Sequence, residues 1–163
     1  MIMALVALAL APLEFFVLQR VLDRPPGNKI ESVTEVILKD VNTPHEPYSS
    51  IPPPSGPQVA GGAPWGIHDE PIPYEVQVAN LSEGGVIVQY NCVPESTECV
   101  EIVRDLDALY QQFRGLKLII APALAVGDAR IAMTALNRLE KLDAYRERPI
   151  VNFIEAYLEI PDE

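Results

Sequence analysis

The sequence predicts an α+β fold, with a small mixed or antiparallel sheet and helices packed on one face of it. Two short apolar runs, at 84–90 and 116–122, have the length and the β-branched residues that are typical of strands. The segment between them and the last segment of the chain both show the three- and four-residue spacing of amphipathic helices. At 163 residues, the chain has room for one domain with a sizeable core.

The strands are predicted from local composition. Residues 29–41 are rich in Val and Ile and predict one or two short strands at an edge of the sheet. The runs at 84–90 and 116–122 are expected to be neighbours in that sheet. Residues 129–139 fit a strand or a helix, and an alternation of side chains favours a strand in their first half. The alternating residues are Ile131, Met133 and Ala135.

Two helices are expected to pack on this sheet. The first ends at Gly115, and its apolar stripe consists of Cys99, Ile102, Val103, Leu106, Tyr110 and Phe113. The second lies within 148–160 and has Pro149 in its first turn, where a proline is tolerated. Its apolar face consists of Ile150, Phe153, Ile154, Tyr157 and Leu158.

The segment 42–75 holds most of the 16 prolines, interspersed with glycines. Neither a helix nor a regular strand ladder can persist through such a composition. We expect it to wrap over the body as an ordered loop, with Trp65 as its anchor in the core.

The charge balance is acidic, with 23 Asp and Glu residues against 12 Lys and Arg, a net charge of -11. There is no basic run and no basic-aromatic cluster. Nucleic acid is excluded as an expected partner, because binding phosphates needs a positive surface.

The first eighteen residues are apolar except for Pro12 and Glu14, a length that can span a bilayer. We therefore expect a transmembrane anchor at 1–22 and a folded domain at 23–163. A cleaved signal peptide and a buried helix of the fold stay open as alternatives. Arg20 and Arg24 follow the segment, which favours a cytoplasmic domain.

The two cysteines, Cys92 and Cys99, indicate the opposite orientation. They are separated by a short segment that contains Pro94 and small hydroxyl residues, which suits a tight loop between a strand and a helix. A disulfide there would stabilise the fold by about 2 kcal/mol and would place the domain in an oxidising, extracytoplasmic compartment. A corner of a metal site and two free thiols remain alternatives.

No sequence pattern predicts catalysis. His45 and His68 lack any spacing that pairs imidazoles on one helix face, and Ser55 lacks a nucleophile elbow. The glycine-rich "AGGAPWG" has no Walker lysine and does not precede a helix. Glu83 and the other acidic residues near it are expected to form a solvated rim. We therefore expect no cofactor.

Several motifs resemble those of the prokaryotic family called domain of unknown function 3105, over roughly Val33 to Glu163. The matching segments are "YSSIPPPSGPQ", "PWGIHDEPIPYE", "VANLSEGGVIVQY", "MTALNRL" and "FIEAYLEIPDE". The cysteine segment "YNCVPESTEC" is similar to one in some members. The resemblance implies a membrane-anchored protein with P-P-T-S-G-P-H and V-H-N-L-E-H-G motifs.

The histidines of these motifs are replaced in this chain. Gln58, Ala79 and Glu83 stand where the family pattern has histidine, and Ser82 stands where it has glutamate. The resemblance implies a possible copper or zinc site in relatives, since imidazole is a common ligand of both metals. An amide, a methyl group and a carboxylate form at most a poor substitute.

These observations favour a non-enzymatic, single-pass membrane accessory subunit. Its extracytoplasmic domain would bind other membrane subunits of a larger complex, and the N-terminal helix would lie in the bilayer. The alternative function is metal binding, to copper or zinc, through His45, His68 and Glu83. An enzyme would need a nucleophile or an acid/base pair that the sequence does not display.

Overall fold

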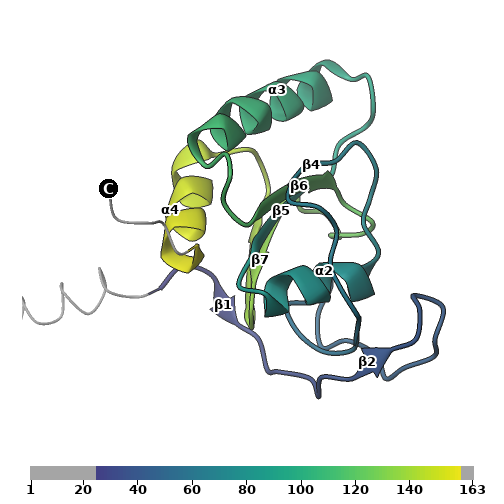
Figure 1. Ribbon diagram of the computed structural model, residues 1–163. Helices are drawn as coiled ribbons and strands as arrows, with labels where there is room; N and C mark the ends of the chain where they lie inside the picture. The colour runs from purple at the N-terminus through teal and green to yellow at the C-terminus, as the bar shows by residue number, and fades with distance from the viewer. Residues whose placement is uncertain (1–24, 159–163) are drawn as a thin grey trace, which may run out of the picture.

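The computed structural model describes residues 25–158, which form a six-stranded mixed sheet, a separate two-stranded sheet and three helices (Figure 1). The elements are β1 (Asn28–Lys29), β2 (Ile37–Leu38), β3 (Gln58–Val59), β4 (Gly66–Ile67), α2 (Tyr74–Ser82), β5 (Val86–Tyr90), α3 (Thr97–Gln112), β6 (Leu118–Pro122), β7 (Ile131–Ala135), β8 (Arg138–Leu142) and α4 (Glu147–Tyr157). The α+β class is confirmed.

The large sheet has the order β1-β8-β7-β5-β6-β4. β5 and β6 are parallel neighbours in register from Val86↔Leu118 to Tyr90↔Pro122, and α3 connects them. β7 pairs antiparallel with β5, and β8 returns beside β7 in a hairpin. Asn137 in the hairpin turn has a φ of 59°, a conformation that Asn tolerates better than most residues. The predicted pairing of the runs at 84–90 and 116–122 is confirmed.

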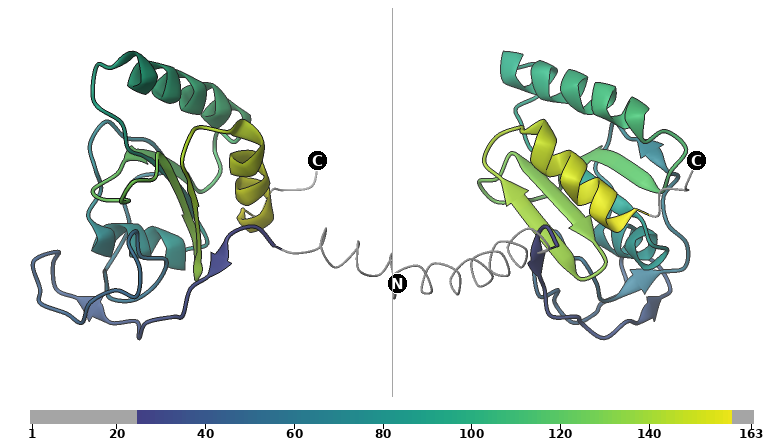
Figure 2. Two further views of the ribbon diagram at one scale, coloured as in Figure 1. Left: turned by 180° about the vertical axis from the view of Figure 1, so that it is seen from behind. Right: turned by 90° about the vertical axis from the view of Figure 1, so that its left-hand side faces the viewer.

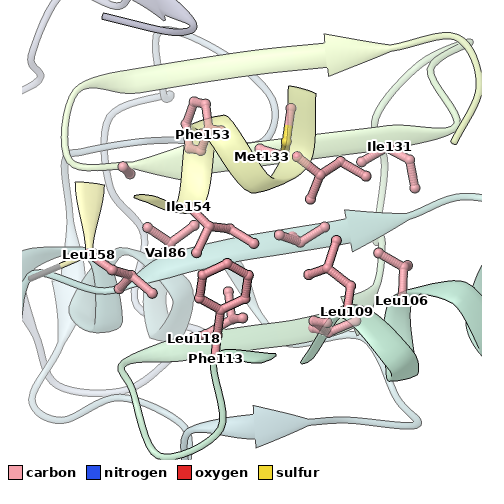
Figure 3. Packing of buried hydrophobic residues seen from close by; sticks show 14 of the residues in the cluster. Val86, Leu106, Leu109, Phe113, Leu118, Ile131, Met133, Phe153, Ile154 and Leu158 are labelled. Atoms are coloured by element: carbon pink, nitrogen blue, oxygen red, sulfur yellow. The ribbon is translucent and has the colours of Figure 1, made fainter. Parts of the chain in front are cut away.

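One face of the sheet carries the larger core, beneath α3 and α4 (Figure 2). Side chains of both helices converge on the apolar residues of β5, β6 and β7 (Figure 3). The fully buried members include Val86, Val88, Leu106, Leu118, Ile131, Met133, Ile150, Phe153 and Ile154. Burying one large apolar side chain contributes about 1.5–3 kcal/mol. This cluster therefore provides much of the driving force for folding.

The opposite face is covered by α2, so the prediction that the helices pack on one face is wrong. The α2 side of the sheet buries a second apolar cluster. Its members are Ile72, Leu81, Ile87, Ile119 and Ala121. Successive strand residues point to opposite faces, so Ile87 lies under α2 while Val86 and Val88 lie under the other helices. The apolar runs of the parallel pair β5–β6 need cover on both faces.

The proline-rich segment wraps over the body as predicted, and it does so along the α2 side, but it also contains regular structure. β3, β4 and the start of α2 all lie within 42–75. Trp65 packs against the second cluster, and a Cβ at Gly85 would lie 2.5 Å from its ring. Trp65 is thus the anchor that the sequence predicts, and Gly85 provides the space for it.

The strands expected at 29–41 divide between two sheets. β1 is the edge strand beside β8, whereas β2 pairs with β3 in the parallel two-stranded sheet. The edge position predicted for this region therefore holds for β1.

The structure contains the Cys92–Cys99 disulfide, in the connection from β5 to α3. The expected membrane anchor at 1–22 lies outside the described residues. Between residues 25 and 158, no helix has the length and hydrophobicity needed to cross a bilayer.

Candidate functional site

The first motif segment, Pro52–Gln58, is buried along its whole length although most of it is not regular structure. The Tyr48 hydroxyl donates a hydrogen bond to the Pro57 carbonyl at 2.8 Å. Gly56 lies beneath the ring of Tyr48, with a φ of 127° that L side chains rarely adopt. Both the space and the backbone conformation therefore require glycine in this motif.

The second motif segment forms α2 and its C-terminus. Ala79 and Glu83 are four residues apart, so they lie on the same side of the helix, one turn from each other. Ala79 is 5% exposed, whereas Glu83 caps the helix and is exposed. Gln58 is 8% exposed and lies on β3, which packs directly against α2. The three positions thus come from one strand and the helix beside it.

Asn80, between these positions, fastens the proline-rich segment to α2. Its Oδ1 accepts a hydrogen bond from the Ala63 amide at 2.8 Å, and its Nδ2 donates to the Ala63 carbonyl at 2.9 Å. A Cβ at Gly62 would lie 2.5 Å from the Asn80 side chain. The Asn80 side-chain amide therefore pairs with the Ala63 backbone as a neighbouring strand would. Glycine at position 62 leaves the space that this close approach needs.

His45 contacts Glu75 in the first turn of α2, at the end of the helix that lies away from Glu83. Its Nε2 lies 3.2 Å from Glu75 Oε1, and its Nδ1 lies 2.7 Å from the Glu46 carbonyl oxygen. Both partners are acceptors, so the ring satisfies both only as an imidazolium that donates from each nitrogen. The pKa of His45 is accordingly raised, first by the Glu46 carbonyl and then by Glu75. The sequence did not reveal this pair, because the two residues are 30 positions apart.

The raised pKa predicts a pH-dependent contribution to stability. Protonated His45 is favoured in the folded state, so its contribution is complete below the ordinary pKa of 6.5 and is lost as pH rises through the folded value. We expect His45→Gln to lower the free energy of unfolding more at about pH 5.5 than at about pH 8.5. Urea unfolding of both chains at the two pH values measures this, and an equal difference at both would contradict it.

The other two candidate metal ligands have separate surroundings. His68 Nε2 lies 2.8 Å from the Pro64 carbonyl oxygen, and Glu83 stands at the C-terminus of α2. The Glu83 carbonyl accepts a hydrogen bond from Lys117 Nζ. Within the described part of the chain, no group of three His, Cys, Asp or Glu side chains is placed to hold a metal ion. His45, His68 and Glu83 are therefore not brought together.

An apolar groove lies between α3 and the edge of the sheet, with a volume of about 490 Å³. It lies beside the C-terminal ends of the parallel strands β5 and β6, where α/β sheets commonly bind ligands. Its apolar lining comprises Ile67, Tyr90, Cys99, Val100, Val103, Leu106 and Ile120, and its charged lining comprises Asp69, Glu95, Arg104 and Asp107. No local sequence pattern indicates this groove.

Two of the lining residues show why the helical spacing of α3 does not predict the groove. Val103 belongs to the apolar stripe predicted to face the sheet, but it is 39% exposed. Leu109, which is not part of that stripe, is buried. Val100, outside that stripe, is 60% exposed. The apolar surface of α3 therefore extends beyond the part that the sheet covers.

The fold and this surface define an α+β domain with an open apolar groove beside α3 and a proline-rich covering segment, 42–75, that packs on α2 and contributes Ile67 and Asp69 to the groove. The chain belongs to the family described as "Protein of unknown function (DUF3105)", which matches residues 42–163. No curated protein and no solved structure matches it. The matched range begins in the proline-rich segment, so it includes both motif segments, the groove and the disulfide.

Proposed function

We propose that this protein is a non-enzymatic, single-pass membrane accessory subunit whose extracytoplasmic domain binds and stabilises a larger membrane protein complex. The N-terminal apolar segment would hold it in the bilayer. The disulfide supports an oxidising compartment for the domain. The observation that carries the proposal is the apolar groove beside α3.

The groove has the features of a protein-binding surface. Ile67, Val100 and Val103 are 41%, 60% and 39% exposed, and all three line it. Val93 nearby in the chain is 70% exposed. Exposed apolar residues gathered around a depression and rimmed by charges mark interaction sites, whereas single exposed ones do not.

The rim charges indicate the chemistry of the partner. Three acidic residues line the groove against one basic residue, Arg104. Arg104 is itself bonded to a neighbouring carboxylate, because its Nη2 lies 2.8 Å from Asp105 Oδ1. A segment that combines apolar side chains with Lys or Arg would complement this surface. We therefore assign the groove to an apolar, basic segment of a membrane subunit.

Site-specific photo-crosslinking in native membranes tests the proposal. A photoreactive residue at position 103 should crosslink to a membrane subunit, through a peptide that carries apolar and basic residues. The same residue at position 136 is the control. Leu136 is 43% exposed but follows β7, which runs antiparallel to β5, so it lies at the opposite end of the sheet from the groove.

A substitution provides the quantitative form of the test. Val100→Asp places a charge in the apolar lining and should reduce recovery of the partner subunits on a native gel by about tenfold or more, as expected for a residue central to an interface. Leu136→Asp should leave recovery unchanged. Equal recovery with both variants, or crosslinks from 136 but not from 103, would refute the assignment.

We do not propose the metal-binding alternative, because no observation favours it. His45 and His68 each bond to different partners, and Glu83 is at the far end of α2 from the residue that His45 contacts.

A further inference from the structure

The Cys92–Cys99 disulfide occupies a distinctive place in the topology. Cys92 lies two residues after the end of β5, and Cys99 lies in the first turn of α3. β5, α3 and β6 form a parallel strand–helix–strand unit. A cysteine pair at the helix N-terminus of such a unit is the setting of thiol–disulfide redox motifs. Here six residues separate the cysteines, where those motifs have two.

The two cysteine residues differ in exposure. Cys99 is 7% exposed, whereas Cys92 is partly exposed. Their chain neighbours Val93 and Val100 are among the most exposed apolar residues, and the groove begins at Cys99. Cys92, which also packs against the main core, is therefore the more exposed cysteine of the pair, and Cys99 borders a groove that can hold a protein segment.

The helix favours Cys99 as the sulfur that leaves as a thiolate. α3 has 16 residues, and the partial positive charge at its N-terminus stabilises a thiolate in the first turn. Ser96 caps the helix by accepting a hydrogen bond from the Cys99 amide at 3.1 Å. Glu95, Glu98 and Glu101 oppose this effect, but Glu98 is paired with Arg130, whose Nε lies 3.0 Å from its Oε1.

Most of the packing of α3 on the sheet lies outside the disulfide loop. The disulfide joins residues only seven positions apart, and the stabilisation that a disulfide provides is smaller for a short loop than for a long one. Three of the four buried residues of α3, Ile102, Leu106 and Leu109, lie beyond the loop, and the fourth is Cys99 itself. Reduction should accordingly leave the domain folded.

We propose that the Cys92–Cys99 disulfide is a thiol–disulfide exchange site that accepts two electrons from a cysteine pair of a partner protein. A thiolate of the partner attacks Sγ of Cys92, a mixed disulfide forms, and Cys99 leaves as a thiolate. The second partner thiol, on losing its proton, attacks the partner sulfur of the mixed disulfide, and Cys92 leaves. The partner gains a disulfide, and this chain gains two thiols.

The acidic surroundings make the site selective for positively charged thiols. Three carboxylates, Glu95, Asp69 and Asp107, line the adjacent groove against one basic residue, Arg104. Approach of an anionic thiolate is disfavoured there, and approach of a thiol that also carries an ammonium group is favoured. This inference stands independently of the accessory role, because it can be tested with small thiols alone.

The experiment measures reduction of the full chain, extracted in mild detergent, by cysteamine and by 3-mercaptopropionate. The reactions are quenched by alkylation and read by mass spectrometry, in the native state and in guanidinium. We expect the native disulfide to react with cysteamine within about threefold of the rate in the unfolded chain, since access is not blocked. Reaction with 3-mercaptopropionate should be about tenfold slower in the native state, but not in the unfolded chain.

The site of attack and the state of the product complete the test. Early quenching should locate the cysteamine adduct on Cys92 by peptide fragmentation. The reduced chain should keep its circular dichroism spectrum, with a Tm lower by about 5–10 °C. A native rate more than tenfold below the unfolded rate, an adduct mainly on Cys99, or unfolding upon reduction would each overturn the proposal and leave the disulfide a structural one.

Discussion

Replacing Phe153 with alanine should lower the free energy of unfolding by about 3–5 kcal/mol, the largest effect that we expect from a single substitution. Phe153 lies on α4 and is fully buried, and its ring centroid is 4.8 Å from the ring centroid of Tyr157. It also contacts the N-terminal edge of the sheet, because a Cβ at Gly27 would lie 2.7 Å from its Cε2. Truncation would therefore open a cavity where helix, sheet and N-terminal segment meet.

Equilibrium denaturation by urea measures this loss. The matched control is Leu136→Ala, which also truncates a large apolar residue but at a 43% exposed position. It should change stability by no more than about 0.5 kcal/mol. Equal losses in the two variants would show that burial of Phe153 does not determine its contribution.

Replacing Asn80 with alanine should cost about 2–4 kcal/mol and release the covering segment. Asn80 is 1% exposed, and both ends of its amide bond to the backbone of Ala63. Alanine would remove both hydrogen bonds and leave two backbone groups without them. We expect faster proteolysis near residues 60–68 at a denaturant concentration that leaves the sheet folded.

Asn152→Ala is the control, because Asn152 is exposed on α4. It should alter neither the stability nor the cleavage pattern. Unchanged proteolysis of the covering segment in Asn80→Ala would contradict the fastening role assigned to this side chain.

The strands and helices whose burial follows a simple period were predictable. β5, β6 and β7 are short apolar runs, and the buried face of α4 contains Ile150, Phe153 and Ile154, as its spacing predicts. The second strand of the hairpin, β8, was missed because Arg138 and Lys141 interrupt its alternation. In each confirmed case, one side of the helix or strand packs against apolar neighbours, and the spacing of apolar residues in the sequence indicates that side.

α2 was not predictable in this way. Five consecutive residues, from Gln77 to Leu81, are buried, because the helix contacts both the sheet and the covering segment. Two of them, Gln77 and Asn80, are polar, and each bonds to backbone groups. A helix enclosed on several sides has no solvent-facing stripe, so its period cannot be recognised from hydrophobicity.

Only those parts of the candidate site that are formed by residues close together in the sequence were predicted. Cys92 and Cys99 are close in the chain, and their disulfide was expected. The bond between His45 and Glu75 and the groove beside α3 depend on packing between distant segments, which no local pattern encodes. The family motifs singled out Gln58, Ala79 and Glu83, and the structure places them on β3, within α2 and at its C-terminus, outside the lining of the groove.

The order of elements along the chain has a consequence for biosynthesis. β5 through α4 occupy one uninterrupted stretch, so their contacts can form soon after each element leaves the ribosome. β1, in contrast, pairs with β8 through Asn28↔Leu139, and the Pro26 carbonyl accepts a hydrogen bond from the Tyr157 hydroxyl. More than a hundred residues must be translated before these partners exist. We expect the N-terminal strand to remain unpaired through most of synthesis and to join the sheet only as the final helix docks.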